Sequence, residues 1–288
     1  MNKKMTAFYL MVIPATVLFF SFHTLPVIMG IFYSFTNWNG LAPSYKFVGF
    51  KNYLNVIKDA EVYGAYWFTF RFAILTTIIV NAISLLVAMG LHARIKLKNA
   101  FRAIYFLPNI LSMLIIAFIF NYFFSNIIPD LMKNLGADSL AFNILGRVET
   151  AWIGIVLVTV WQATAFNIIL YLAGLQTIPA DLYEASSLDG ANKWKEFWHI
   201  TFPMIAPFFT INMVLAMKNF LMVFDQIVAM TGGGPAKATM SISFLIYSDG
   251  FQGGSFAYQS ANSVIYFIII VLISVFQLKV LQRRETSL

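Results

Sequence analysis

The sequence predicts an all-α integral membrane protein with six transmembrane helices, on two observations. Of its 288 residues, 60% are hydrophobic and only 11% are charged, and a soluble domain could not cover its surface with so few polar groups. Stretches without Asp, Glu, Lys or Arg also recur, and a spanning helix needs about 20 predominantly apolar residues. We therefore predict a single transmembrane domain, residues 1–288, with spans at approximately 8–35, 68–91, 103–125, 151–177, 202–230 and 256–281.

The uncharged stretches justify these spans one by one. The first runs from Met5 to Tyr45, which is longer than the apolar region of a signal peptide and has no convincing cleavage site, so we expect a retained helix. Pro14 and Pro26 are expected to kink this helix. The fifth span is interrupted by Lys218 and Asp225. The other four spans fall in the uncharged stretches 72–91, 103–129, 150–180 and 250–278.

The placement of Lys and Arg predicts the orientation. If the N-terminus is cytoplasmic, the cytoplasmic segments carry more Lys and Arg than the outer loops, as the positive-inside rule requires. The loop from Arg94 to Arg102 gives the clearest indication. We therefore expect both termini, and residues 178–201, on the cytoplasmic side.

Composition and spacing exclude several kinds of site. Cysteine is absent, and the three histidines lie far apart with no acidic residue at ligand spacing, so we expect no metal site. The formal charge of +7 matches anionic lipid headgroups better than nucleic acid in so apolar a chain. The glycine-rich segment from Gly232 to Thr239 lacks the G-K-[ST] ending of a phosphate loop, and no predicted strand precedes it. We therefore expect no nucleotide site and no cofactor in this chain.

Three ionisable residues lie within or beside predicted spans. Lys218 would be costly facing lipid, so we expect it to face either a substrate path or a contact with another helix or subunit. Asp225 follows seven residues later, about 10 Å along a helix, which is too far for a direct pair. Arg71, near the outer end of the second span, is expected to snorkel towards the headgroups.

The segment 178–201 separates the fourth and fifth spans and predicts a helix, a glycine turn and a second helix. Asp181 suits a helix N-terminus, and Gly190 offers the permissive backbone needed to end that helix and begin the next. Trp194, Phe197, Trp198 and Thr201 recur at helical spacing, so we expect them to pack against another surface. Periodicity alone fits two interpretations equally well: a platform that a partner contacts at Glu184, or an interfacial helix anchored by tryptophans.

The residues of this segment carry a family resemblance. The string from Leu182 to Ala191, L-Y-E-A-S-S-L-D-G-A, followed by Phe197, Ile200 and Pro203, closely resembles the EAA loop of binding-protein-dependent ABC importer permeases, from which it departs at Ser186 and Phe202. Other segments are similar to elements of the sugar permeases and of their maltose-type carbohydrate subgroup: residues 47–53 (F-V-G-F-K-N-Y), 102–108 (R-x-x-x-F-L-P), 224–225 (F-D) and 231–239 (T-G-G-G-P-x-x-x-T).

The resemblance implies a fold, a function and a set of partners. The fold is the transmembrane domain of a type I ABC importer (MetI-like), in a multi-pass protein of the bacterial plasma membrane. The function is that of a carbohydrate permease subunit, which is not itself an enzyme. Such a subunit forms a heterodimer with a second, homologous permease and receives sugar from an extracytoplasmic solute-binding protein. A cytoplasmic ABC ATPase dimer binds ATP and Mg²⁺ and couples to the EAA loop.

The resemblance also implies site residues. Coupling to the ATPase is assigned to Glu184, Ala185, Asp189, Gly190 and Ala191. A sugar path needs directional hydrogen bonds and aromatic faces, and the helices that flank the EAA loop supply these groups. We therefore expect Thr159, Gln162, Lys218 and Asn219 along the path, with hydrogen bonding between helices as the alternative role for the uncharged residues.

Two other classes of function are weighed against this one. An enzyme acting on a lipid-linked glycan would need ionisable groups converging at one membrane face, whereas Lys218 and Asp225 stand alone within the spans. A secondary transporter would work without an ATPase, and six helices without intramembrane acid pairs disfavour it. Co-purification with an ATPase and a second permease separates the three hypotheses.

Overall fold

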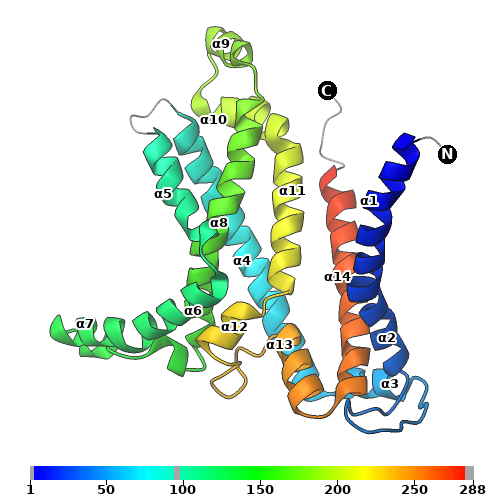
Figure 1. The fold of residues 1–288 in the computed structure, drawn as a ribbon. Helices are drawn as coiled ribbons and strands as arrows, with labels where there is room; N and C mark the ends of the chain where they lie inside the picture. The colour runs from blue at the N-terminus through cyan, green and yellow to red at the C-terminus, as the bar shows by residue number, and fades with distance from the viewer. Residues whose placement is uncertain (1–2, 94–97, 283–288) are drawn as a thin grey trace. The chain divides into compact units, whose positions relative to one another are not determined.

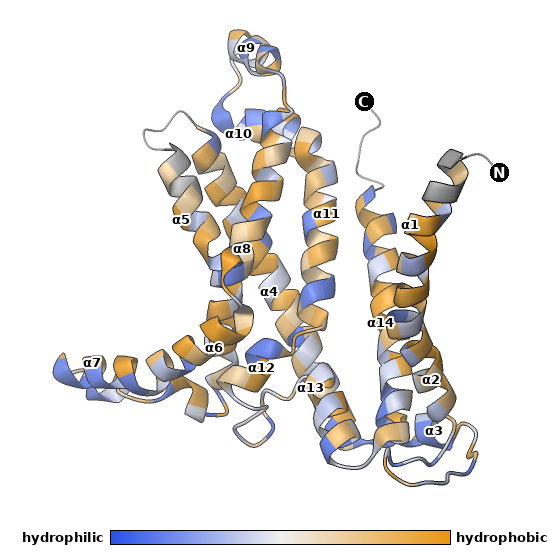
Figure 2. Ribbon diagram, viewed as in Figure 1, coloured by the Kyte–Doolittle hydropathy of each residue, from blue (hydrophilic) through white to orange (hydrophobic). Residues whose placement is uncertain are grey.

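The computed structural model describes residues 3–93 and 98–282, and every regular element within them is helical (Figure 1). Arg94 and Lys96, on which the orientation prediction draws, lie outside the described residues. Six helical segments are long and apolar enough to cross a membrane, which confirms the predicted number: Phe8–Tyr33, Ala60–His92, Met113–Asn134, Ala151–Gln176, Lys193–Leu221 and Phe256–Gln282. Most residues along these long helices are hydrophobic, as their orange colour shows (Figure 2).

The chain divides into two compact units, residues 1–63 with 245–269 and residues 64–244 with 270–288. The first unit contains the N-terminal span, in which α1 (Lys3–Phe19) passes through a π-helical turn, Phe20–Thr24, into α2 (Leu25–Tyr33). The break falls just before Pro26, which lies in the first turn of α2 where its missing N–H is not needed. The unit also contains α3 (Lys51–Lys58), a π-helical turn (Ser248–Gln252) and the start of α14 (Phe256–Gln282).

The second span begins earlier than predicted, and a side-chain cap explains why. α4 starts at Ala60 and ends at His92. The Asp59 carboxylate accepts hydrogen bonds from the backbone N–H groups of Glu61 (2.8 Å) and Val62 (3.4 Å), so it satisfies donors that a helix start leaves free. Its other oxygen accepts a hydrogen bond from the Tyr258 hydroxyl of α14 at 2.7 Å.

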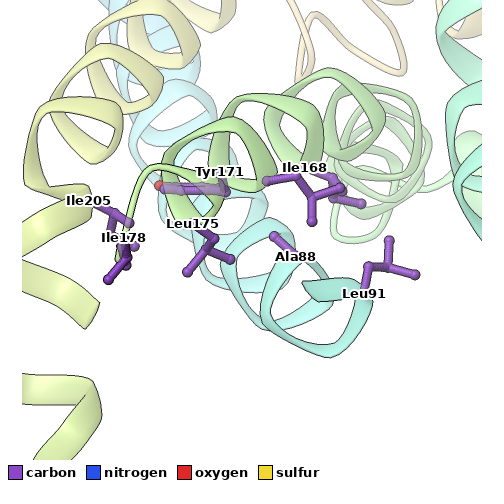
Figure 3. Packing of buried hydrophobic residues seen from close by; sticks show 8 residues of the cluster. Ala88, Leu91, Ile168, Tyr171, Leu175, Ile178 and Ile205 are labelled. Carbon is purple, nitrogen blue, oxygen red and sulfur yellow. The ribbon is translucent and has the colours of Figure 1, made fainter. Parts of the chain in front are cut away.

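The second unit is built around α8 (Ala151–Gln176), which packs against α5 (Lys98–Ile110) and α11 (Phe202–Leu221). At one end of α8, apolar side chains of three helices interlock (Figure 3). Tyr171 is fully buried there, and its hydroxyl donates to Asn81 Oδ1 of α4 at 2.7 Å. The cluster consists of Ala88, Leu91, Ile168, Tyr171, Leu172, Leu175, Ile178 and Ile205.

The third span is not the single helix predicted over 103–125. α5 ends at Ile110, and α6 (Met113–Tyr122) begins after Ser112, whose backbone is extended. Pro108 lacks an N–H, which favours a break near it. Gln162 Nε2 of α8 donates to the carbonyl oxygen of Leu111 at 3.2 Å and lies 3.5 Å from that of Pro108, so a facing helix satisfies the freed carbonyls. A π-helical turn (Phe123–Ile127) and α7 (Ile128–Asn134) follow.

The fifth span ends earlier than predicted. α11 ends at Leu221, and residues 225–230 form a separate helix, α12 (Asp225–Met230), so the prediction of one helix over 202–230 is wrong at its C-terminal end. The acidic Asp225 lies in the first turn of α12, where the helix dipole favours negative charge. The Ser241 hydroxyl donates to the Val223 carbonyl oxygen at 2.9 Å, which satisfies the backbone exposed by the break.

Candidate functional site

The segment 178–201 folds as the sequence predicts: a helix, a glycine turn and a second helix. α9 (Ala180–Leu188) ends in a turn in which the Ala191 N–H donates to the Ser186 carbonyl at 2.9 Å and the Gly190 N–H donates to the Ser187 carbonyl at 3.1 Å. These two bonds define a Schellman motif, which requires a left-handed residue after the cap. Gly190 has φ +73°, and a Cβ at this position would meet no atom within 4 Å. The backbone, not a lack of space, therefore calls for glycine.

One side-chain contact joins α9 to α11, and another caps the short helix that follows the turn. The Tyr183 hydroxyl and the Thr201 hydroxyl lie 2.9 Å apart, which joins α9 to the residue just before α11. The Asn192 side chain accepts from the Lys195 N–H at 2.9 Å and so caps the short helix α10 (Lys193–Glu196). α10 continues through a π-helical turn, Phe197–Thr201, into α11.

α9 projects beyond α10 at the end of the second unit (Figure 1). None of the residues of α9 is buried, and Leu188 is 90% exposed. Four of the five residues assigned to coupling are exposed, and the fifth, Ala191, is half-buried. Ser186, where the sequence departs from the family pattern, donates its hydroxyl to the Tyr183 carbonyl at 3.0 Å and so uses it within the helix. A short helix with no buried face needs another surface to stabilise it.

The residues that follow, which we expect to pack against another surface, differ in their exposure within this chain. Thr201 is buried, but Trp194 is 70% exposed and Trp198 is 45% exposed. The two indoles contact each other edge to face, with ring centroids 5.7 Å apart, instead of inserting into the core of the second unit. The exposed rings beside α9 enlarge the apolar surface that a partner or lipid can cover.

Two of the four predicted path residues, Gln162 and Asn219, line one cavity of about 240 Å³ in the second unit. Asn109 and Asn167 contribute further amide groups to its wall, and Asn167 donates to the Ala163 carbonyl at 2.8 Å. Its remaining lining residues are Ala163, Phe166, Leu215, Ala216 and Phe220. The cavity therefore combines hydrogen-bonding amides with aromatic rings, the chemistry expected of a site for polar, uncharged ligands.

The other two predicted path residues do not line this cavity. Thr159 is only 2% exposed and donates to the Ile155 carbonyl of its own helix at 2.8 Å. Lys218 precedes Asn219 on α11 and its side chain is exposed. Within the described residues it makes no ion pair. An exposed lysine within a span still needs polar surroundings. Lys218 is therefore still predicted to face either the substrate path or another subunit.

The segment 231–241 is an ordered loop closed by its own threonines. The Thr231 and Thr239 hydroxyls lie 2.8 Å apart, and Thr239 also donates to the Gly234 carbonyl. Gly233 has φ +81°, and a Cβ there would lie 3.0 Å from side-chain atoms of Met240 and Phe244. The glycines and threonines of the motif therefore shape a tight loop.

One wall of the Gln162 cavity was not predicted from the sequence. Asn109 lies in the last turn of α5, next to the break that a continuous helix over 103–125 would not contain. Pro108 beside Asn109 is the available signal, because proline within an apolar stretch favours a break in the helix, and a polar side chain elsewhere must then satisfy the carbonyls at the break. The sequence favours Gln162 because its amide can hydrogen-bond a sugar. In the structure this amide donates to the Leu111 carbonyl at the break, which places Gln162 beside Asn109.

Comparisons with known proteins agree with this geometry. Residues 81–286 match the family described as binding-protein-dependent transport system inner membrane component. The multiple sugar-binding transport system permease protein of Streptococcus mutans is 38% identical over 93% of this chain and 92% of its own length. A probable starch degradation products transport system permease protein of Thermoanaerobacterium thermosulfurigenes is 36% identical over 92% of this chain and 90% of its own.

A solved structure shows the same fold. A chain of a bacterial ABC transporter involved in the import of the acidic polysaccharide alginate matches with a TM-score of 0.85 at 22% identity, over 98% of this chain and 96% of that chain. The prediction of an ABC importer transmembrane domain is confirmed.

Proposed function

Because the chain belongs to the family of binding-protein-dependent transport system inner membrane components, we propose that it is a permease subunit of an ABC importer for a carbohydrate. The sugar permeases among its relatives support the substrate class. The structure of α9 is the observation that most strongly supports this proposal. α9 is an exposed helix with no buried face, it lies within the EAA-like string, and it ends in a Schellman turn at Gly190.

The proposed partners follow from what this chain exposes. An ABC ATPase dimer, which binds ATP and Mg²⁺, receives α9 through Glu184, Ala185, Asp189, Gly190 and Ala191. A second, homologous permease completes the translocation path, and an extracytoplasmic solute-binding protein delivers the sugar. The protein lies in the bacterial plasma membrane with both termini and α9 on the cytoplasmic side, as the excess of Lys and Arg in those segments supports.

The proposed mechanism is alternating access driven by the partner ATPase. Closure of the ATPase dimer displaces α9, and the bond between Tyr183 and Thr201 passes this displacement to α11. The same helix carries Asn219, and the helix before α9 carries Gln162, so two walls of the amide-lined cavity connect to the moving segment. Transmission requires that the ATPase bind the two states of the segment with different affinity.

A charge reversal on α9 tests the proposal. The tagged chain is expressed in a strain of its native host from which the chromosomal gene has been deleted. The complex is then purified and reconstituted. Glu184→Lys is expected to lose both sugar uptake and sugar-stimulated ATP hydrolysis, because a cation replaces an exposed carboxylate on a contact surface. Asp138→Lys, the same reversal at an exposed site in the loop after α7, is expected to retain both. Full activity of Glu184→Lys, or purification of the wild type without an ATPase, would contradict the proposal.

A further inference from the structure

A second cavity lies in the second unit, at the start of α4 and α8, and the proposed function does not use it. It has a volume of about 400 Å³ and is called the outer cavity below. Its size falls within the range of about 300–1,000 Å³ that is usual for small-molecule sites. The lining residues are Gly64, Trp67, Phe68, Arg71, Phe72, Val148, Glu149, Trp152 and Ala238.

Arg71 is held in this cavity by an aromatic ring. Its guanidinium carbon lies 4.5 Å from the centroid of the Trp152 ring, a cation–π contact. The Trp152 indole is itself fixed, because its Nε1 donates to the Glu149 carbonyl oxygen at 2.9 Å. Arg71 makes no ion pair in the part of the chain that the structure describes, so its N–H donors remain available to a ligand. Arg71, which we expect to snorkel towards the headgroups, is thus also stacked on an indole that positions its guanidinium.

Trp67 supplies a ring face to the same cavity. It lies one helical turn before Arg71 on α4, and its side chain is 64% exposed. Residues four apart on a helix share a face. The stack of Arg71 on Trp152 occupies one indole, whereas the Trp67 indole is open to a ligand.

The position of the outer cavity favours a ligand that comes from water. The 20 uncharged residues from Phe72 to Leu91 span about 30 Å at 1.5 Å per residue, which equals the thickness of the hydrocarbon core. Arg71 immediately precedes this stretch. In the proposed orientation the outer cavity thus lies at the extracytoplasmic boundary of the membrane, on the side from which the substrate arrives.

The charges of the outer cavity favour a neutral, hydroxyl-rich ligand. Arg71 and Glu149 contribute one positive and one negative group. A lipid phosphate would be attracted by the first and repelled by the second, whereas sugar hydroxyls can accept from a guanidinium and donate to a carboxylate at the same time. An aromatic ring beside such groups provides the apolar surface on which a pyranose ring can lie.

We propose that the outer cavity is a second carbohydrate subsite, in which Trp67 stacks on a pyranose ring while Arg71 and Glu149 hydrogen-bond its hydroxyls. The subsite rests on the proposed function, since it receives the same sugar before the amide-lined cavity does. It is separate from that cavity, with which it shares no lining residue.

Uptake by native cells tests the subsite. The chromosomal gene is deleted and complemented with wild type or variants, and KM and maximal rate are measured with radiolabelled glucose, maltose, trehalose, raffinose and maltotriose. Trp67→Ala is expected to raise KM for the transported sugar about three- to tenfold, the scale of one aromatic contact. Arg71→Gln is expected to raise KM at least as much, because a charged hydrogen-bond donor is lost. Both variants should keep a nearly unchanged maximal rate. Trp67→Phe is expected to recover most of the affinity because it retains a ring.

A matched control and three contrary outcomes complete the test. Tyr63→Ala removes an exposed aromatic side chain one turn earlier on α4 that does not line the outer cavity, and it is expected to leave KM unchanged. If wild type takes up a sugar and the Trp67 and Arg71 variants match it, the subsite is refuted while the proposed function stands. If Arg71→Gln instead loses co-purified phosphatidylglycerol at unchanged KM, the cavity holds lipid and the proposal is overturned. Failure of wild type to take up any of the five sugars overturns both.

Discussion

A substitution series at Gly190 isolates the backbone of the turn that ends α9. A Cβ at this position meets nothing within 4 Å, so any effect of a small side chain comes from the φ of +73° and not from a clash. The left-handed conformation costs an ordinary residue roughly 1–2 kcal/mol, and asparagine tolerates it better than others. The cost is higher for a β-branched residue, for which positive φ is a genuine outlier. The expected order of coupled activity is therefore Gly, Asn, Ala and Val.

The conformational cost at Gly190 should reduce coupled activity without unfolding the protein. A cost of about 1 kcal/mol shifts an equilibrium about fivefold, and α9 has no buried residue through which this cost would reach the core. Gly190→Ala should therefore reduce sugar-stimulated ATP hydrolysis of the reconstituted complex about fivefold at limiting ATPase subunit, with an unfolding temperature close to that of wild type. Gly136→Ala is the matched control, because Gly136 has φ +74° and equally open surroundings in the loop after α7. Equal activity of Gly190→Val and wild type would refute the reasoning.

Three further predictions concern the contacts around this turn and the amide-lined cavity. Tyr183→Phe removes the hydroxyl that bonds Thr201. It should lower the local stability of α9 by about 0.5–1.5 kcal/mol and so increase the hydrogen exchange of its amides. Unchanged exchange would contradict a role of this hydrogen bond in holding α9. Gly174→Ala would place a Cβ 2.7 Å from the Phe208 ring and should lower the free energy of unfolding by about 1–3 kcal/mol, which Phe208→Leu should partly restore. Gln162→Leu leaves the carbonyls of the α5–α6 break unpaired and should cost about 1–3 kcal/mol in a thermal unfolding assay, whereas an unchanged stability would point to a role in substrate contact alone.

The sequence predicts those features of the fold that depend on composition and on a single residue's conformation. Six spans follow from counting apolar residues, because lipid imposes a minimum length on a helix whatever its neighbours are. The turn at Gly190 follows because a helix end with glycine has few alternatives. Both predictions use information that is local in the chain.

The misplaced features depend on partners distant in sequence. The end of α11 at Leu221 is stabilised by Ser241, and the break between α5 and α6 is satisfied by Gln162. No local sequence pattern shows that a hydroxyl 18 residues away donates a hydrogen bond to the carbonyl at the end of this helix. The outer cavity has the same origin: the sequence places Arg71 near the outer end of a span, and only the fold brings Trp152 beneath its guanidinium.

The close contact between α8 and α11 bears on how displacement of α9 could reach the substrate path. Gly174 lets the Phe208 side chain approach α8 closely, and the Asn212 amide reaches towards the Asn167 carbonyl at 3.5 Å. Packed interiors do not deform continuously, so two helices in such contact shift together more readily than they separate. α9 lies between these two helices in sequence, and under the proposed mechanism a pull on it moves both as one body. The change in the amide-lined cavity should then arise on its third wall, at Asn109, where the break after α5 supplies the freedom that α8 and α11 lack.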